Sequence, residues 1–171
     1  ITPKDVDLQE LLIIFSTLSM NIKGKVVLTE PMAFNLKIGS EPIDLAGLVS
    51  LIPMLKKFDM GGKLTLAATL AGNAEKPIYN ADIKLNGFSA SLPELKEPLR
   101  RLDVSLKVKN DLVNMENMVM EIGPTDISGT LVVKDFQNPN ISAALKSNNL
   151  DLDAILPKAE EKPVVVITEA T

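Results

Sequence analysis

The chain contains few of the side chains that usually carry catalysis. Its 171 residues include no histidine and no cysteine, which excludes Ser–His and Cys–His nucleophilic pairs, thiol redox chemistry and the common zinc sites. The densest carboxylate groups are Asp151-x-Asp153 and Glu160-Glu161, and neither has the glycine and ligand spacing of a calcium loop. A carboxylate pair for glycoside hydrolysis is not excluded by sequence, because such pairs meet through folding. We therefore predict a non-enzymatic protein with no metal and no cofactor.

Charge and composition narrow the class of ligand. The net charge is −4, lysine and arginine occur singly or in pairs such as Lys56-Lys57 and Arg100-Arg101, and aromatic residues make up 4% of the chain. No basic stripe is present for a phosphate backbone and few rings are present to stack on bases, so we predict no nucleic-acid partner. The hydrophobic fraction of 46% is mostly aliphatic. An aliphatic surface fits acyl chains better than flat aromatic ligands, although plain structural cores are aliphatic too.

Strict alternation of apolar and polar residues indicates the elements that must position this apolar surface. In 63–70, 79–85 and 102–108 every second residue is apolar and its neighbours are largely polar, the pattern of strands with one buried and one wet face. Similar segments make about eight strands in all: 22–29, 32–39, 112–122, 126–135 and 140–147. Turn residues such as Gly61-Gly62, Asn110-Asp111 and Gly123-Pro124 separate them. The sequence therefore predicts an antiparallel meander.

Two phrases recur along the chain. Residues 22–30 and 127–135 share the pattern Ile-x-Gly-x-apolar. Residues 6–12, 43–49 and 150–156 each begin apolar-Asp-Leu and end on two apolar residues. We expect each of the last three to open a short helix with Asp7, Asp44 or Asp151 at its N-cap. Pro53 and Pro157 then end the second and third helices. The recurrence predicts an internal repeat, and stacked repeats usually present an extended surface.

The repeat and the composition divide the chain into three parts. Residues 1–20 are predicted to be the helical end of a preceding repeat, 21–157 a β-groove repeat segment, and 158–171 a linker or the start of a next segment. No apolar run is long enough to span a bilayer and residue 1 is not Met. We therefore expect the sequence to begin inside a larger protein.

Four stretches follow one another along the chain: Gly62–Leu66 continuing to Gly72, Pro77–Phe88, Pro98–Val104, and Ile127–Leu131 closing on Leu150–Leu152. Their order and pattern resemble the AsmA-like family of bacterial envelope proteins, which is related to the bridge-like lipid transfer proteins. The resemblance covers about residues 20–157 and has no catalytic motif.

The resemblance implies a fold, a place and a role. The fold is mainly β with short helices, in which a long antiparallel meander sheet curves into a groove with an aliphatic inside and a polar outside. The full-length protein would be anchored to the inner membrane of a Gram-negative bacterium, through parts not contained in this sequence, and would project into the periplasm. Its role would be phospholipid transport and outer-membrane homeostasis.

The leading hypothesis is that the groove guides phospholipid acyl chains between the inner and outer membranes. Two alternatives stay open: the short helices or a second layer cover the apolar face completely, or the chain is an assembly factor whose sheet edges bind envelope proteins. The predicted lining residues share one face of their strands: Leu64, Leu66, Leu70, Ile83, Leu85, Leu102, Val104, Leu106, Val108, Met118, Met120, Leu131 and Val133.

Overall fold

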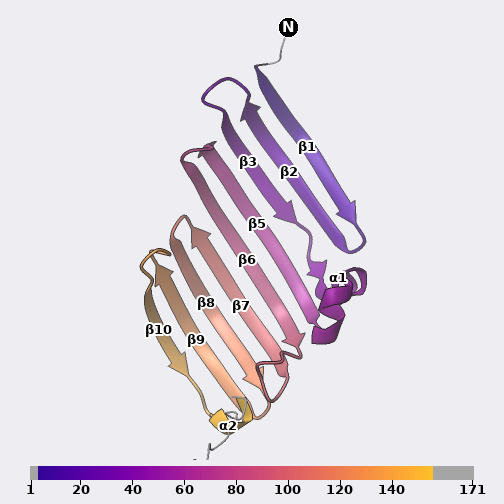
Figure 1. Cartoon of the computed structure of the whole chain (residues 1–171), viewed down its shortest axis with the longest axis vertical. Helices are drawn as coiled ribbons and strands as arrows, with labels where there is room; N and C mark the ends of the chain where they lie inside the picture. Colours follow the sequence, from indigo (N-terminus) through magenta and orange to yellow (C-terminus); the bar gives the residue numbers. More distant parts are fainter. Residues whose placement is uncertain (1–3, 156–171) are drawn as a thin grey trace, which may run out of the picture.

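The computed structural model describes residues 4–155, which form one antiparallel sheet with three short helical segments (Figure 1). The sheet order is β1-β2-β3-β5-β6-β7-β8-β9-β10, and β4 also pairs with β5. The strands are β1 Asp5–Phe15, β2 Leu18–Val27, β3 Ala33–Ser40, β4 Ile43–Asp44, β5 Gly61–Asn73, β6 Pro77–Ala90, β7 Leu99–Lys109, β8 Leu112–Ile122, β9 Thr125–Lys134 and β10 Asn140–Lys146. The helices are α1 Leu45–Leu51, the 3₁₀ segment η1 Pro53–Phe58, and α2 Leu152–Ile155.

This architecture confirms the predicted fold. Each strand after β4 pairs with the strand that follows it, and β1 and β10 lie at opposite edges of a sheet that is not closed. The eight predicted strand segments all fall on strands of this sheet. Residues 156–171, and with them Pro157 and the predicted linker, lie outside the described residues.

Two of the three expected helices form, and the first does not. Asp44 caps α1, because its carboxylate accepts a hydrogen bond from the Ala46 N–H at 3.2 Å, and α2 follows Asp151. Residues 6–12, in contrast, belong to β1, so the prediction of a helical end over 1–20 is wrong. The physical reason is pairing: β1 joins β2 through a two-residue turn in which Ser16 has a φ of 53°, and it pairs with β2 along its whole length.

The repeated glycines have a backbone explanation. Gly24 of β2 and Gly129 of β9 have φ angles of 138° and 155°, values that side chains with a Cβ rarely adopt. A Cβ added at Gly24 would collide with the Asn35 carbonyl oxygen of β3, and one at Gly129 with the Ala144 carbonyl oxygen of β10. Both glycines therefore permit the same close approach between neighbouring strands. The sequence repeat corresponds to a structural repeat of β2–β3 and β9–β10.

The most buried residues gather at one end of the sheet, which we call the helix end because α1, η1 and α2 lie there (Figure 1). Thr125 is the most buried polar residue and binds the following segment: its hydroxyl accepts from the Asp151 N–H at 2.9 Å. Beside it, the N–H groups of Asn149 and Asn148 donate to Asp126 and hold the pKa of its carboxyl below the usual value. The buried apolar residues are Ile43, Ala90, Leu99, Val104 and Ile122.

Replacing the repeated glycine tests the close approach of β9 and β10. We predict that Gly129→Ala lowers the free energy of unfolding by about 2–3 kcal/mol, because the backbone strain and the collision with Ala144 add. The matched control is Gly87→Ala in β6, where φ is 58° but no atom lies within 4 Å of the new Cβ. This control loses only about 1 kcal/mol. Equal losses in urea unfolding of the two variants would contradict the explanation.

Candidate functional site

The strand register gathers the apolar residues on one face of the sheet, the apolar face. Residues that are paired across neighbouring strands lie on the same face. One row of pairs runs from Leu66 to Ile83, Leu106, Met115 and Leu131 across β5 to β9. All five side chains in this row are half-buried. Parallel rows of the same kind lie on both sides, so the apolar face is continuous across these strands.

All thirteen predicted lining residues lie on this face. The pairs Leu64–Leu85 and Leu85–Val104 form a second row towards the helix end, and Val108–Val113–Val133 a third row towards the other end. Val104 is buried, with 5% of its surface exposed, and the other twelve are half-buried. The structure thus brings together residues that the alternation assigned to separate strands.

Sequence reasoning missed the part of this face that lies on the first three strands. The alternation in 22–29 and 32–39 predicts strands, but all of the predicted lining residues lie in later segments. The register continues the same rows through β3, β2 and β1, for example from Leu70 to Leu36 and from Ile38 to Ile22 and Leu11. The further residues are Leu8, Leu11, Ile13, Ile22, Val26, Phe34, Leu36 and Ile38.

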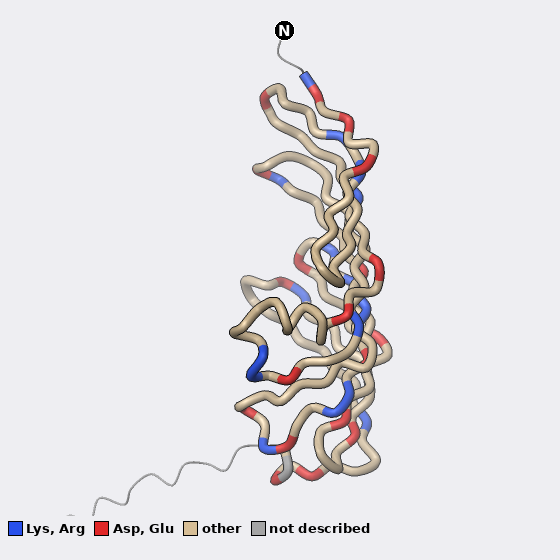
Figure 2. Tube along the Cα trace, turned by 90° about the vertical axis from the view of Figure 1, so that its right-hand side faces the viewer, with Lys and Arg blue, Asp and Glu red and all other residues tan. Residues whose placement is uncertain are grey.

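The helices leave the middle of the apolar face uncovered. Within residues 4–155, α1 packs mainly against β5 and η1, and all three helical segments lie at the helix end (Figure 1). In the edge-on view of Figure 2, the η1 segment and several strand-connecting turns project to the left, while most charged positions of the strands line the right. The apolar face is therefore the floor of an open groove, and the polar face is its outer side.

Two open hollows lie away from this floor. A hollow of about 600 Å³ lies between two turns, where Glu30, Pro31 and Met32 face Asn73, Ala74 and Glu75. A second, of about 240 Å³, lies on the polar face between Asp82, Lys107 and Glu116. The apolar face is the better site for an extended ligand, because a ligand that lies along a surface needs length and continuity but no enclosed cavity.

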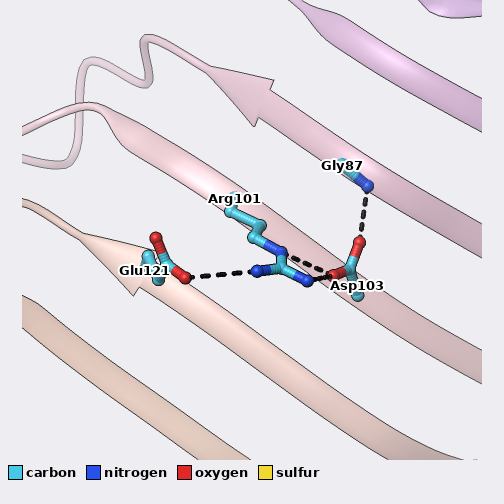
Figure 3. Close-up of polar contacts among 4 residues, drawn as sticks. All are labelled: Gly87, Arg101, Asp103 and Glu121. Carbon is cyan, nitrogen blue, oxygen red and sulfur yellow. Dashed lines mark hydrogen bonds and ion pairs between the residues drawn. The ribbon is translucent and has the colours of Figure 1, made fainter.

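A polar cluster on the outer side of the sheet connects β6, β7 and β8 (Figure 3). Asp103 of β7 accepts a hydrogen bond from the Gly87 N–H at 2.6 Å, and the Arg101 guanidinium donates to its other oxygen from Nε at 2.6 Å. Arg101 also lies 3.6 Å from Glu121 of β8. The hydrogen bond from Gly87, followed by the contacts with Arg101, holds the pKa of the Asp103 carboxyl below its usual range.

Gly87 lies in a β-bulge, where two residues of β6 oppose one residue of β7. The register passes from the pair Leu85–Val104 to the pair Phe88–Leu102. The extra residue brings Phe88 back to the apolar face, although the count of residues would place it on the polar face. The alternation in 102–108 places Asp103 on the polar face, and Gly87 fits a turn between strands by sequence alone. The structure instead places Gly87 inside β6, at the bulge.

Other kinds of site find little support in the described residues. No group of three or more acidic side chains in residues 4–155 is arranged to hold a metal ion. Over the same range, none of the helices combines the length and the apolar character needed to cross a membrane.

Comparison with known proteins adds no relative: no family model matches the chain, nor does any curated protein or solved structure.

The pH dependence of stability tests the role of Asp103. Because the pKa of Asp103 is lower in the folded protein than its ordinary value of 3.8, the charged carboxylate stabilises the fold above about pH 5, and this contribution is lost as the pH falls through the folded pKa. We predict that Asp103→Asn lowers the free energy of unfolding by about 1 kcal/mol at neutral pH, and that its difference from the unchanged chain shrinks below about pH 4. Urea unfolding between about pH 7 and pH 2.5 measures both.

The control for this series is Asp82→Asn. It also removes one carboxylate from the polar face, but from the neighbouring strand β6. A difference between Asp103→Asn and the unchanged chain that stays constant with pH would contradict the account. So would an equal loss in the control.

Proposed function

We propose that this chain binds lipid acyl chains along the apolar face and performs no bond chemistry. The observation that carries the proposal is the open groove floor, a continuous row of aliphatic side chains from β1 to β10 that are half-buried in its middle. A soluble monomer rarely leaves a large contiguous apolar surface uncovered unless something binds there. The thirteen lining residues, with those of β1 to β3, would contact the acyl chains.

The size of the groove floor supports a lipid as ligand. Neighbouring strands lie about 4.8 Å apart, so the path across nine strands is about 38 Å long. An acyl chain that fills one half of a bilayer's hydrocarbon core extends about 15 Å. Burial of each methylene contributes roughly 0.8 kcal/mol. The groove floor therefore offers room for an entire acyl chain, with the open side left for a headgroup in water.

The larger setting of the proposal comes from the family resemblance. In that setting the chain is a segment of an AsmA-like periplasmic protein of a Gram-negative bacterium, attached to the inner membrane by parts outside this sequence. The segment would guide phospholipids between the inner and outer membranes. The open, unclosed groove supports this role, because lipids can pass along a continuous apolar floor without crossing an enclosed wall.

The exposed sheet edges support a second candidate function, assembly of envelope proteins by strand addition. Both β1 and β10 offer an unpaired side within the described residues. Every residue of β10 is exposed, including Ile141 and Leu145. In this case the partner is a protein strand, and the ligand recovered with the chain would be protein without lipid.

A pair of substitutions on adjacent residues of β7 distinguishes the two faces. Leu106 lies in the central row of the groove floor, and Lys107 lies on the polar face 2.9 Å from Glu116. We predict that Leu106→Asp abolishes binding of a fluorescent fatty acid, because it places a charge in the path of the acyl chain, while Lys107→Ala binds as the unchanged chain does. Binding titrations, with circular dichroism as a check on folding, measure this. Equal binding by both variants would refute the lipid proposal.

Photochemical labelling tests the same site without a substitution. A fatty acid that carries a diazirine in its tail should label peptides from β5 to β9 at residues of the apolar face, such as Ile83 and Met115. Mass spectrometry locates the labelled residues. Labelling spread equally over the polar-face neighbours, such as Lys84 and Asn114, would contradict the proposed position of the acyl chain.

A further inference from the structure

One hydroxyl group lies on the groove floor away from the helix end. Tyr79 of β6 pairs with Leu70 of β5, and Leu70 pairs with Leu36 of β3, so the tyrosine side chain belongs to the apolar face. Within residues 4–155, the other residues that pair in the floor rows away from the helix end are apolar or glycine. The open part of the described floor therefore offers one hydrogen-bonding side chain, that of Tyr79.

Tyr79 holds a fixed place near the far rim, which is the end of the sheet opposite the helices and contains the β5–β6 and β7–β8 turns (Figure 1). The side-chain oxygen of Asn110 accepts a hydrogen bond from the Tyr79 N–H at 3.2 Å, and the Asn110 N–H donates to the Tyr79 carbonyl at 3.1 Å. The strand β6 lies inside the sheet between β5 and β7. The exposure of Tyr79 is therefore not the exposure of a sheet edge.

The hydroxyl of Tyr79 is free to bind a ligand. The residue exposes 38% of its surface, and its hydroxyl has no hydrogen-bond partner within residues 4–155. Tyrosine combines an apolar ring with a polar tip, so where an apolar surface meets water the ring stays on the apolar side and the hydroxyl reaches an acceptor. A phospholipid has the same boundary at the head of each acyl chain, where the ester oxygens accept hydrogen bonds. Tyr79 therefore matches the head of an acyl chain.

The two ends of the groove floor differ in burial. At the helix end, Ala90, Leu99, Val104 and Ile122 each expose 5% of their surface or less. At the far rim, the strand ends and turns after β5, β7 and β9 carry exposed charges of both signs: Glu75, Lys76, Asp111, Lys134 and Asp135. A charged headgroup is costly to place in the buried end and easily solvated at the far rim. A bound lipid therefore directs its headgroup to the far rim and its tail to the helix end.

We propose that Tyr79 donates a hydrogen bond to an ester oxygen at the head of a phospholipid acyl chain, whose tail runs along β5 and β6 towards the helix end. The tail passes Ala81 and Ile83 and ends near Leu85. The path from Tyr79 to Leu85 is about 20 Å long, and an acyl chain in one half of a bilayer extends about 15 Å, so the floor holds its length. The inference rests on the proposed lipid binding and adds the orientation of the bound lipid.

Fluorescence quenching tests this orientation, because the chain contains one tyrosine and no tryptophan. Tyrosine emission from the full chain therefore reports on Tyr79. We expect a lysophospholipid with a nitroxide beside its ester group to cause a large loss of this emission, and one with a nitroxide at its tail end a small loss. Equal losses, or a larger loss with the tail nitroxide, would overturn the orientation. If neither lipid binds, as measured by electron paramagnetic resonance of the nitroxide, lipid binding itself is refuted.

Moving the tyrosine along β6 provides the matched control. Phe88 lies on the same strand and the same face near the helix end, where it pairs with Leu102. The double variant Tyr79→Phe, Phe88→Tyr keeps the number of aromatic rings and carries its only tyrosine at the other end of the path. The tail nitroxide should now cause the larger loss of emission. An unchanged order of quenching would contradict the proposed orientation.

The single variant Tyr79→Phe tests the hydrogen bond, because it removes only the hydroxyl oxygen. We expect its affinity for an unlabelled lysophospholipid to fall about fivefold, the usual effect of one hydrogen bond, while its affinity for a medium-length n-alkane stays unchanged. Calorimetric titration measures both, together with the affinity for a free fatty acid. Equal losses for lysophospholipid and alkane would show a packing role and overturn the proposal. An unchanged affinity for lysophospholipid would also overturn it, as would a loss confined to the fatty acid, whose carboxylate would then be the ligand.

Discussion

The groove floor exists only if nine neighbouring strands turn their apolar residues to the same face of the sheet. A strand shows every second residue to the same face, so a slip of one residue would move its apolar set to the outer side. The strands here are long, and each β-bulge adds one residue that shifts the alternation of its strand by one position. Gly87 in β6 and Asn117 in β8, with φ angles of 58° and 52°, are the residues that make two of these shifts. The continuity of the apolar face therefore rests on a few backbone positions.

Within residues 4–155 the sheet has no second layer over its middle, and this shapes both its stability and its binding surfaces. Full burial is confined to the helix end, where residues such as Ala90 and Ile122 are enclosed. Elsewhere an apolar side chain is shielded only by its neighbours in the sheet. Burial of the remaining apolar area by a ligand on the floor, or by a strand at the β1 edge, would stabilise the fold through linkage. Lipid binding on the groove floor and strand addition at a sheet edge therefore concern two separate surfaces that stay partly exposed in this fold.

Local patterns predicted what depends on local chemistry. Alternation located the strands of 63–70 and 102–108 and the face of each lining residue, and Asp44 marked the start of α1. The run Leu11–Phe15 has no alternation, so its pattern fits a helix as well as a strand, and pairing with β2 decided between them. The bond between Asp103 and Gly87 joins residues of two strands at a bulge. No spacing rule indicates such a contact, because it exists only once the register of β6 and β7 is set.

The most direct test of the open groove floor is the lipid content of the chain itself. The protein would be expressed in bacteria, purified without detergent, and extracted with organic solvent for quantitative mass spectrometry of lipids. We expect phospholipid in stoichiometric amounts, lost in Leu106→Asp and retained in Lys107→Ala. A stable, folded chain recovered free of lipid would contradict it, and would favour a surface that binds protein strands at the sheet edges.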